Sequence, residues 1–189
     1  MTKIAIFASG SGTNAENIIN SFSETPLTIT SIFCNKKNAG IIERAKKLSV
    51  PCRIFSREEF YDSNTILSEL LSQQIDYIIL AGFLWKIPES LITAFPNRII
   101  NIHPALLPNY GGKGMYGSFV HEAVIANKEK ESGITIHLVD EKYDNGTIIF
   151  QARCPINPDD TPESLAAKVH ELEYKHFPSV IREYIENNT

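Results

Sequence analysis

The sequence predicts an α/β protein with a doubly wound, mostly parallel sheet and an antiparallel C-terminal extension. Three observations lead to this prediction. Short runs rich in β-branched residues alternate with amphipathic stretches over residues 1–102, which is typical of buried parallel strands and their connecting helices. A glycine-rich turn follows the first run, and two alternating runs joined through Asn145-Gly146 come late in the chain. We expect a single domain over 1–189 with one half at 1–102 and another at 103–189.

The first half is predicted to alternate strands with helices. Strands are expected at 3–8, 27–34, 51–55, 77–81 and 98–102, and helices at 14–22, 39–48, 64–74 and 88–95. Each helix repeats apolar residues at helical spacing, and Pro88 suits a first helical turn. Because ligands of such sheets bind beyond the carboxyl ends of the strands, the loops after Ala8, Ala81 and Ile102 are where we expect a site.

The second half has a different pattern. A segment at 104–117 contains four glycines and predicts a long, flexible loop. A helix is expected at 118–127, and two alternating runs at 133–139 and 147–156 predict a pair of strands. Thr161 followed by Pro162 marks the start of a terminal helix, and Pro178 should kink or interrupt that helix.

Composition narrows the class of protein. The chain is 43% hydrophobic and 21% charged, with 18 Lys and Arg against 22 Asp and Glu, which is ordinary for a globular protein. No apolar run approaches a membrane span, no stretch is strongly basic as nucleic-acid binding would favour, and no secretion signal opens the chain. Three widely spaced cysteines without a CxxC pair argue against disulfides and a thiolate metal site. We therefore expect a cytoplasmic protein with no nucleic-acid or membrane partner and no metal.

The loop at 9–14 lies between the first strand and the first helix. Its glycines allow the backbone to approach an anion, and the N–H groups that open a helix favour phosphate. The alternative is a tight turn with Ser and Asn as helix caps. The loop also fits the dinucleotide pattern GxGxxA, but no carboxylate ends the second strand, which disfavours NAD. NADP is excluded only weakly, because Lys36 or Lys37 could meet a 2′-phosphate.

Asn101 and His103 end the strand at 98–102 and share one side of it. A carboxamide donor beside an imidazole suits the stabilisation of a developing oxyanion, whereas the alternative is a polar strand end that satisfies loop carbonyls. Asp144 lies in the late turn, and a carboxylate near His103 would raise the imidazole pKa and favour its cation. Sequence spacing alone leaves a turn-capping role for Asp144 open.

Together these motifs resemble those of the folate-dependent formyltransferases, most closely the branch that formylates glycinamide ribonucleotide. The matching segments are 10–14, 80–83, 101–108 and 144–146 with Ile149 and Gln151, and the resemblance runs from about residue 3 to 186. It implies a Rossmann-like formyltransferase fold that takes 10-formyltetrahydrofolate as co-substrate in purine synthesis. The first half would then hold the phosphate and the second half the folate and the catalytic groups.

The resemblance also assigns roles to residues. Asn101 and His103 would stabilise a tetrahedral intermediate, while Asp144 keeps His103 protonated and helps to pass a proton to folate. The substrate phosphate would bind Gly12, Thr13 and Asn14, and its ribose or amine would meet His170 and Glu173. The folate would contact Phe83, Leu84, Trp85, Lys86, Ile87, Asn101, Val139, Asp140, Glu141 and Asp144, with Arg57 a candidate for its carboxylate tail.

Some residues depart from that family or are expected to have other roles. Trp85-Lys86 and the segment 111–117 differ from many relatives. His121 is expected on a helix face, His137 in a supporting role, and His176 partly buried.

Alternative functions are a formyltetrahydrofolate hydrolase, a formyltransferase of another amine, and a non-catalytic NADP- or phosphate-binding module. The length of 189 residues disfavours the appended domains of the first two. The protein could be a monomer or a homodimer.

Overall fold

The computed structural model describes residues 1–188. The chain divides into two compact units, the first at Met1–Ile100 and the second beginning at Asn101. The boundary falls inside one strand, two residues before the division between halves that the sequence suggested.

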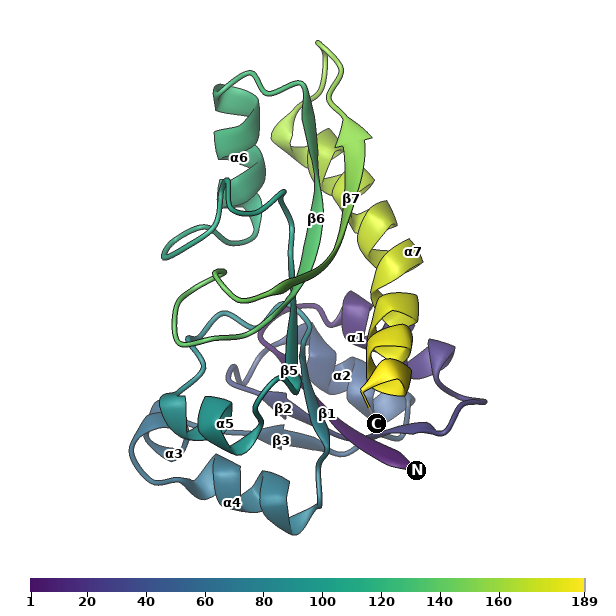
Figure 1. The fold of residues 1–189 in the computed structure, drawn as a ribbon, viewed down its shortest axis with the longest axis vertical. Coiled ribbons are helices and arrows are strands. Elements are labelled where there is room, and N and C mark those ends of the chain that lie inside the picture. The colour runs from purple at the N-terminus through teal and green to yellow at the C-terminus, as the bar shows by residue number, and fades with distance from the viewer. Residues whose placement is uncertain (189) are drawn as a thin grey trace. The chain divides into compact units, whose positions relative to one another are not determined.

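The first unit is a doubly wound sheet, as predicted. Its strands are β1 (Thr2–Ala8), β2 (Leu27–Cys34), β3 (Cys52–Ile54), β4 (Tyr77–Leu80) and the start of β5 (Ile99–His103), in the order β3-β2-β1-β4-β5. The helices are α1 (Thr13–Ser21), α2 (Gly40–Lys47), α3 (Arg57–Tyr61), α4 (Thr65–Ser72) and α5 (Glu89–Ala94). The β1 pairings with β2 and β4, and the β2 pairing with β3, are parallel. Within this unit α1 and α2 lie on one side of the strands and α3, α4 and α5 on the other (Figure 1).

The core of the first unit is rich in aromatic rings. Residues 4–8 of β1 are completely buried, and the Phe7 ring stacks on Phe33 with the ring centroids 5.0 Å apart. Phe55, Phe60 and Phe83 pack around Phe7 at centroid distances of 5.3 to 6.2 Å. Such pairs add specific ring geometry to the burial of apolar area, so they fix β1 and the loops at its carboxyl end.

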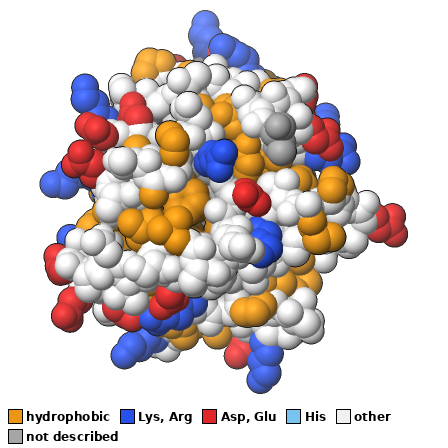
Figure 2. All heavy atoms as spheres, turned by 60° about the horizontal axis from the view of Figure 1, so that its bottom comes forward, with side chains coloured by type: hydrophobic (Ala, Val, Ile, Leu, Met, Phe, Trp, Pro, Cys, Tyr) orange, Lys and Arg blue, Asp and Glu red, His pale blue; other side chains and the backbone are white. Residues whose placement is uncertain are grey.

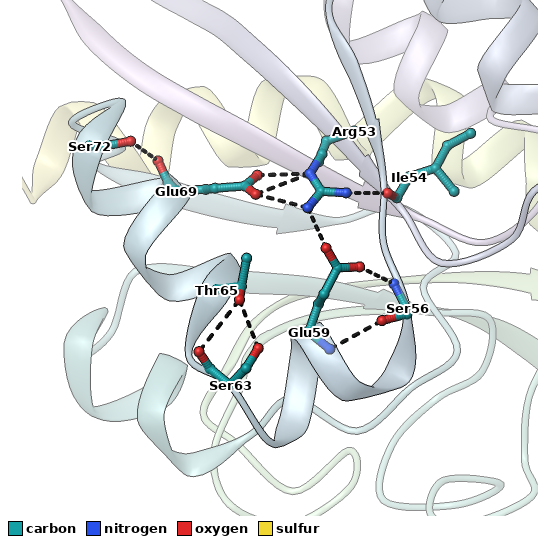
Figure 3. A network of polar contacts seen from close by, with 8 residues as sticks. All are labelled: Arg53, Ile54, Ser56, Glu59, Ser63, Thr65, Glu69 and Ser72. Carbon is teal, nitrogen blue, oxygen red and sulfur yellow. Dashed lines mark hydrogen bonds and ion pairs between the residues drawn. The ribbon is translucent and has the colours of Figure 1, made fainter.

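A polar network joins three elements of the first unit (Figure 3). The Arg53 guanidinium on β3 donates to both carboxylate oxygens of Glu69 on α4 and to Glu59 on α3. Glu59 also accepts from the Ser56 N–H, and these hydrogen bonds lower its pKa to about 2. The planar fork of arginine suits such bidentate pairing, so Arg53 fixes the positions of α3 and α4 against the strand.

The second unit contains the end of β5, followed by α6 (Ser118–Ala126), β6 (Glu131–Leu138), β7 (Ile148–Pro155) and α7 (Pro162–Asn187). β6 and β7 form an antiparallel ribbon in which Gly133 pairs with Arg153, and β6 follows β5 in the strand order. α7 packs along this ribbon and contacts α6. The antiparallel C-terminal extension predicted from the sequence is therefore confirmed.

Two elements differ from what the sequence predicted. α3 was not predicted, although Ser56 and Glu59 form a capping box whose S-x-x-E spacing is a recognised helix start. α7 begins at the predicted Thr161 cap but runs through Pro178 without interruption. The missing hydrogen bond and the ring clash cost about 3 kcal/mol in a helix, and the buried flanking residues Phe177 and Ile181 supply packing that offsets this cost.

The surface and the cysteines complete the description. Lys and Arg side chains are interspersed with Asp and Glu over the face drawn in Figure 2, with hydrophobic side chains between them. Within residues 1–188, the helices are all too short or too polar to cross a membrane. Cys34, Cys52 and Cys154 are free thiols, and burial raises the pKa of Cys52 to about 11.

Candidate active site

Four polar side chains converge in the second unit. Asn101 and His103 point to one side of β5, His137 comes from β6, and Asp144 comes from the turn that leads to β7. The Asp144 carboxylate oxygens lie 3.6 Å from His103 Nδ1 and 3.7 Å from His137 Nε2. Asn101 Nδ2 lies 3.0 Å from His137 Nε2. The predicted set of Asn101, His103 and Asp144 is thus brought together, and His137 joins it.

Hydrogen-bond partners fix how these rings are oriented. His137 Nδ1 faces the Leu138 carbonyl at 2.8 Å, and a carbonyl can only accept. Nδ1 therefore carries the proton, and in the neutral ring Nε2 accepts from the Asn101 amide. Sequence reasoning gave His137 only a supporting role; its place two residues before Val139, on the strand that precedes Asp144, was the available signal.

The pKa values of His103 and Asp144 depend on burial as well as on charge. Burial lowers the pKa of His103 more than Asp144 and the Tyr110 carbonyl raise it, so the net direction is down. Asp144 raises the pKa of His103, in the predicted direction, but desolvation of the ring outweighs the carboxylate. Burial would raise the pKa of Asp144, but contacts with His137, His103 and the Gly112 N–H together bring it below its ordinary value.

Residues 110–112, within the loop at 104–117, contact both His103 and Asp144. His103 Nε2 donates to the Tyr110 carbonyl at 2.7 Å, and the Gly112 N–H donates to Asp144 Oδ2 at 2.9 Å. Gly112 has a φ of +97°, which favours glycine. A Cβ at Gly111 would clash with Leu107 and approach the Asp144 Cβ at 3.2 Å. A substrate oxygen that accepts from His103 Nε2 must therefore replace the Tyr110 carbonyl.

A buried polar network supports the chain that leaves β5. The hydroxyl of Thr135 on β6 is completely buried; it donates to the Ala105 carbonyl and accepts from the Leu107 N–H. Gln151 on β7 donates to both Thr135 and the Leu107 carbonyl. Because buried backbone groups need partners, this network holds residues 105–107 directly beyond His103.

A second polar cluster lies between the two helices of this unit. Glu173 on α7 is 4% exposed, and its carboxylate accepts from His170 Nδ1 at 2.8 Å. That hydrogen bond raises the pKa of the more exposed His170. His121 on α6 is also 4% exposed; burial lowers its pKa, and the charges of His170, Glu173 and His103 also affect it. The predicted pair of His170 and Glu173 is in contact, and His121 lies near it.

In the first unit, the loop before α1 has the geometry expected for anion binding. Gly12 is the N-cap with a φ of +79°, and no side chain caps the helix, so the alternative of Ser and Asn caps does not describe this turn. A Cβ at Gly12 would lie 2.9 Å from the Ile41 Cα, which explains the need for glycine. The N–H groups of Thr13 and Asn14 open the helix, and such groups favour an anion. An adjoining cavity of about 520 Å³ is lined by Ser9, Gly10 and residues 36–40.

The predicted folate segment at Phe83–Ile87 also belongs to the first unit. The Phe83 ring lies in the aromatic core, and Ile87 is buried. The Leu84 N–H donates to the Ser9 hydroxyl, which ties this segment to the loop before α1. The Lys86 carbonyl accepts from the Tyr61 hydroxyl. Ser9 was missed as a linking residue; its position just after β1 was the only signal.

Arg57 and the turn at 139–146 have contacts of their own. The Arg57 guanidinium lies over the Tyr61 and Trp85 rings, at 4.8 and 5.8 Å from their centroids. In the second unit, the Asp140 carboxylate accepts from the Lys142 N–H and from Asn145, so it shapes the turn around Asp144. Val139 is half-buried and Glu141 is exposed.

Comparison with known proteins gives a consistent result. The model of a family described as formyl transferase matches residues 2–181. The chain is 35% identical to the phosphoribosylglycinamide formyltransferase of Bacillus subtilis, over 98% of this chain and 95% of that protein. The crystal structure of the phosphoribosylglycinamide formyltransferase from Streptococcus pneumoniae superposes with a TM-score of 0.86 at 35% identity, covering 98% of this chain and 99% of that one.

A plant relative is longer. The chain is 39% identical over 95% of its length to a chloroplastic phosphoribosylglycinamide formyltransferase of Arabidopsis thaliana. The match spans 64% of that protein.

Proposed function

The chain belongs to the formyl transferase family, in the branch of the phosphoribosylglycinamide formyltransferases, and on that premise we propose that it transfers a formyl group from 10-formyltetrahydrofolate to the amine of glycinamide ribonucleotide. The observation that carries the proposal is the convergence of Asn101, His103, His137 and Asp144 within the second unit. A carboxamide, an imidazole and a carboxylate around one point are the groups that acyl transfer to an amine requires.

The reaction needs two kinds of assistance. The amine nitrogen attacks the formyl carbon, a C–N bond forms, and the carbonyl oxygen becomes an oxyanion. Asn101 and His103 donate hydrogen bonds to that oxygen, and one such donor is worth about 2.7–4 kcal/mol in transition-state energy. The bond from carbon to folate N10 then breaks while a proton moves from the amine to N10.

Asp144 assists the proton transfer. Its depressed pKa keeps it ionised near neutral pH, so it can receive the amine proton through water. When the oxyanion forms beside His103, its negative charge adds to that of Asp144 and favours the imidazolium. The developing charge thus raises the pKa of His103 and strengthens the hydrogen bond that its ring donates to the oxyanion.

The remaining assignments rest on the family resemblance together with local geometry. The substrate phosphate binds the amides of Gly12, Thr13 and Asn14 at the start of α1, where Gly12 is the left-handed N-cap. Glu173 accepts from the ribose hydroxyls, with His170 paired to it. Folate binds through Phe83–Ile87, Val139–Glu141, Asn101 and Asp144, and Arg57 meets its carboxylate tail. A cytosolic location and a monomeric or dimeric state stay predictions.

A folate absorbance assay tests the proposal. The purified protein is mixed with glycinamide ribonucleotide and a 10-formyl folate, and the deformylated folate is followed with time. Signal that depends on both substrates supports the proposal. Deformylation without the ribonucleotide indicates a hydrolase, and no signal at all contradicts a formyl-transfer function.

The cavity beside Lys36 and Lys37 is the observation that favours the alternative of an NADP-binding module. Titration with NADPH, followed by nicotinamide fluorescence, tests it. Saturable binding together with no formyl transfer would replace the proposed function with that alternative.

A further inference from the structure

His121 is a buried polar side chain whose function is not accounted for by the fold. It lies on α6 between the buried residues Val120 and Val124, and it is 4% exposed. Its Nδ1 atom is shielded from solvent and has no hydrogen-bond partner among the residues that the structure describes. A buried nitrogen without a partner costs free energy, so its retention needs an explanation.

The surroundings of His121 point to a ligand with hydrogen-bonding groups. His170, Glu173 and His103 are all close enough for their charges to act on its ring, and α6 packs on the helix that bears two of them. His121 therefore lies in the same unit as the catalytic pair, on the helix that packs against α7, which bears the carboxylate assigned to the ribose. A buried polar group without a partner calls for an explanation, and a functional role is one of those open to it.

The chemistry of the neighbours limits what this partner can be. Glu173 is a carboxylate that only accepts hydrogen bonds when ionised, and its negative charge repels a phosphate. A hydroxyl can donate to Glu173 or to an imidazole nitrogen, and it can also accept from an imidazole N–H. A sugar hydroxyl therefore satisfies Nδ1 in either tautomer and remains compatible with the carboxylate.

We propose that His121 is a substrate-binding residue whose Nδ1 forms a hydrogen bond with a ribose hydroxyl of the amine substrate, beside Glu173. This inference rests on the proposed function and adds a residue that recognises the ribose of the substrate. It predicts that the protein distinguishes the ribonucleotide from its deoxy analogues in part through His121. A site that hydrogen-bonds a hydroxyl rejects an analogue that lacks it, because its own polar group is then left unpaired.

Calorimetric titration of the substrate and its 2′-deoxy and 3′-deoxy analogues tests the proposal. In the wild type, we expect the affinity for at least one analogue to fall by about 10-fold or more. In His121→Phe, which keeps a ring without its nitrogens, the affinity for the full substrate should fall to a similar extent. In the same variant, the analogue penalty, which is the ratio of the affinity for the full substrate to that for the analogue, should shrink to about 2-fold or less. The reason is that the side-chain substitution and the missing hydroxyl remove one and the same hydrogen bond.

Two further variants and a stability measurement separate binding from packing. His121→Asn places an amide atom near the Nδ1 position and should restore much of the affinity and of the analogue penalty. His176→Phe changes another histidine of this unit, one that packs on Phe150, and should leave both unchanged. The thermal midpoint of ligand-free His121→Phe should equal or exceed that of the wild type, since no hydrogen bond of Nδ1 is lost.

The outcomes distinguish this inference from the proposed function. If the wild type binds the ribonucleotide but His121→Phe keeps the full analogue penalty, His121 does not read the hydroxyl and only this inference fails. A lower midpoint with an unchanged penalty would assign His121 to packing. If His121→Phe does not fold, the affinity and penalty of His121→Asn decide. If the wild type binds no ribonucleotide, the proposed function fails first.

Discussion

Asp144 carries the one negative charge shared by the two imidazoles of the candidate site. Its carboxylate faces His103 and His137 at 3.6 and 3.7 Å and accepts from the Gly112 N–H. Its φ of +52° lies in the left-handed region, which is uncommon for a residue other than Gly, Asn or Asp. Asparagine can adopt the same backbone conformation. The variant Asp144→Asn therefore removes the charge without disturbing the turn.

Replacing Asp144 with asparagine should lower kcat by at least about 100-fold, because the charge that favours the His103 cation during the reaction is lost. Substrate dissociation constants should change by only a few fold, since most binding groups lie elsewhere. Steady-state kinetics and calorimetry measure the two quantities. Asp159→Asn, at an exposed position, is the matched control. A near-normal kcat in Asp144→Asn would contradict the role given to this carboxylate.

At the scale of elements, the ribbon of β6 and β7 carries His137 on one strand and leads to Asp144 through its turn. Gly133 allows the two strands to approach closely, because a Cβ there would collide with the carbonyl of Ala152 and reach Leu106. The adjoining Thr135 holds the chain beyond His103. Close pairing of this ribbon therefore determines where three of the four site residues lie.

Gly133→Ala should destabilise the protein by about 3 kcal/mol or more, since the methyl group can be accommodated only by moving one strand away from the other. Urea unfolding gives the free energy of unfolding, and residual formyl transfer reports on the site. Gly10→Ala, where a Cβ meets nothing within 4 Å, should leave the free energy of unfolding nearly unchanged. Equal stability of the two variants would show that the ribbon can open without cost.

At the scale of the whole molecule, histidines make stability depend on pH. Burial lowers the pKa of His103, His121 and His176, whereas Glu173 raises that of His170. For a lowered pKa the unfolded chain binds more protons between the two values, so stability is full above about pH 6.5 and falls on acidification. His170 has the opposite sign, but it is the more exposed group.

We therefore expect a lower free energy of unfolding at pH 5.5 than at pH 7.5. Urea titrations at the two values measure this difference, and it should be smaller in His121→Phe. Burial lowers the pKa of that ring, and the charges of His170, Glu173 and His103 also act on it, so the variant removes a group that must otherwise be protonated against burial. A higher free energy of unfolding at pH 5.5 than at pH 7.5 would contradict this expectation and would mean that the pair of His170 and Glu173 determines the pH dependence.

Most strands and helices could be predicted from the sequence, because they depend on local periodicity. The strand at 27–34 was located to the residue, and Thr161 was identified as a cap from its neighbours alone. α3 was missed because one turn of helix carries little periodicity, and its capping box was the only signal. The continuity of α7 at Pro178 depends on tertiary packing, which the local sequence does not contain.

The candidate site could be predicted only in part for a similar reason. Asn101 and His103 share a strand, so their common side follows from the period of two. Asp144 could be named from the resemblance, but its contacts with both imidazoles depend on the path of the turn between β6 and β7. Asp144 acts on the pKa of His103 in the predicted direction, but burial, which involves many atoms that no motif records, lowers that pKa overall. The orphaned nitrogen of His121 also depends on packing between helices.

The network of Thr135 and Gln151 has a consequence for how this protein could be modified. It anchors residues 105–107 from the strands, and Tyr110 and Gly112 add the contacts of the following loop with His103 and Asp144. The segment at 113–117, which comes after those contacts, can therefore be exchanged in length as well as in sequence while the reactive centre keeps its geometry. Specificity for other amine substrates could thus be engineered, or acquired in evolution, by exchanging this loop segment while the catalytic residues stay in place.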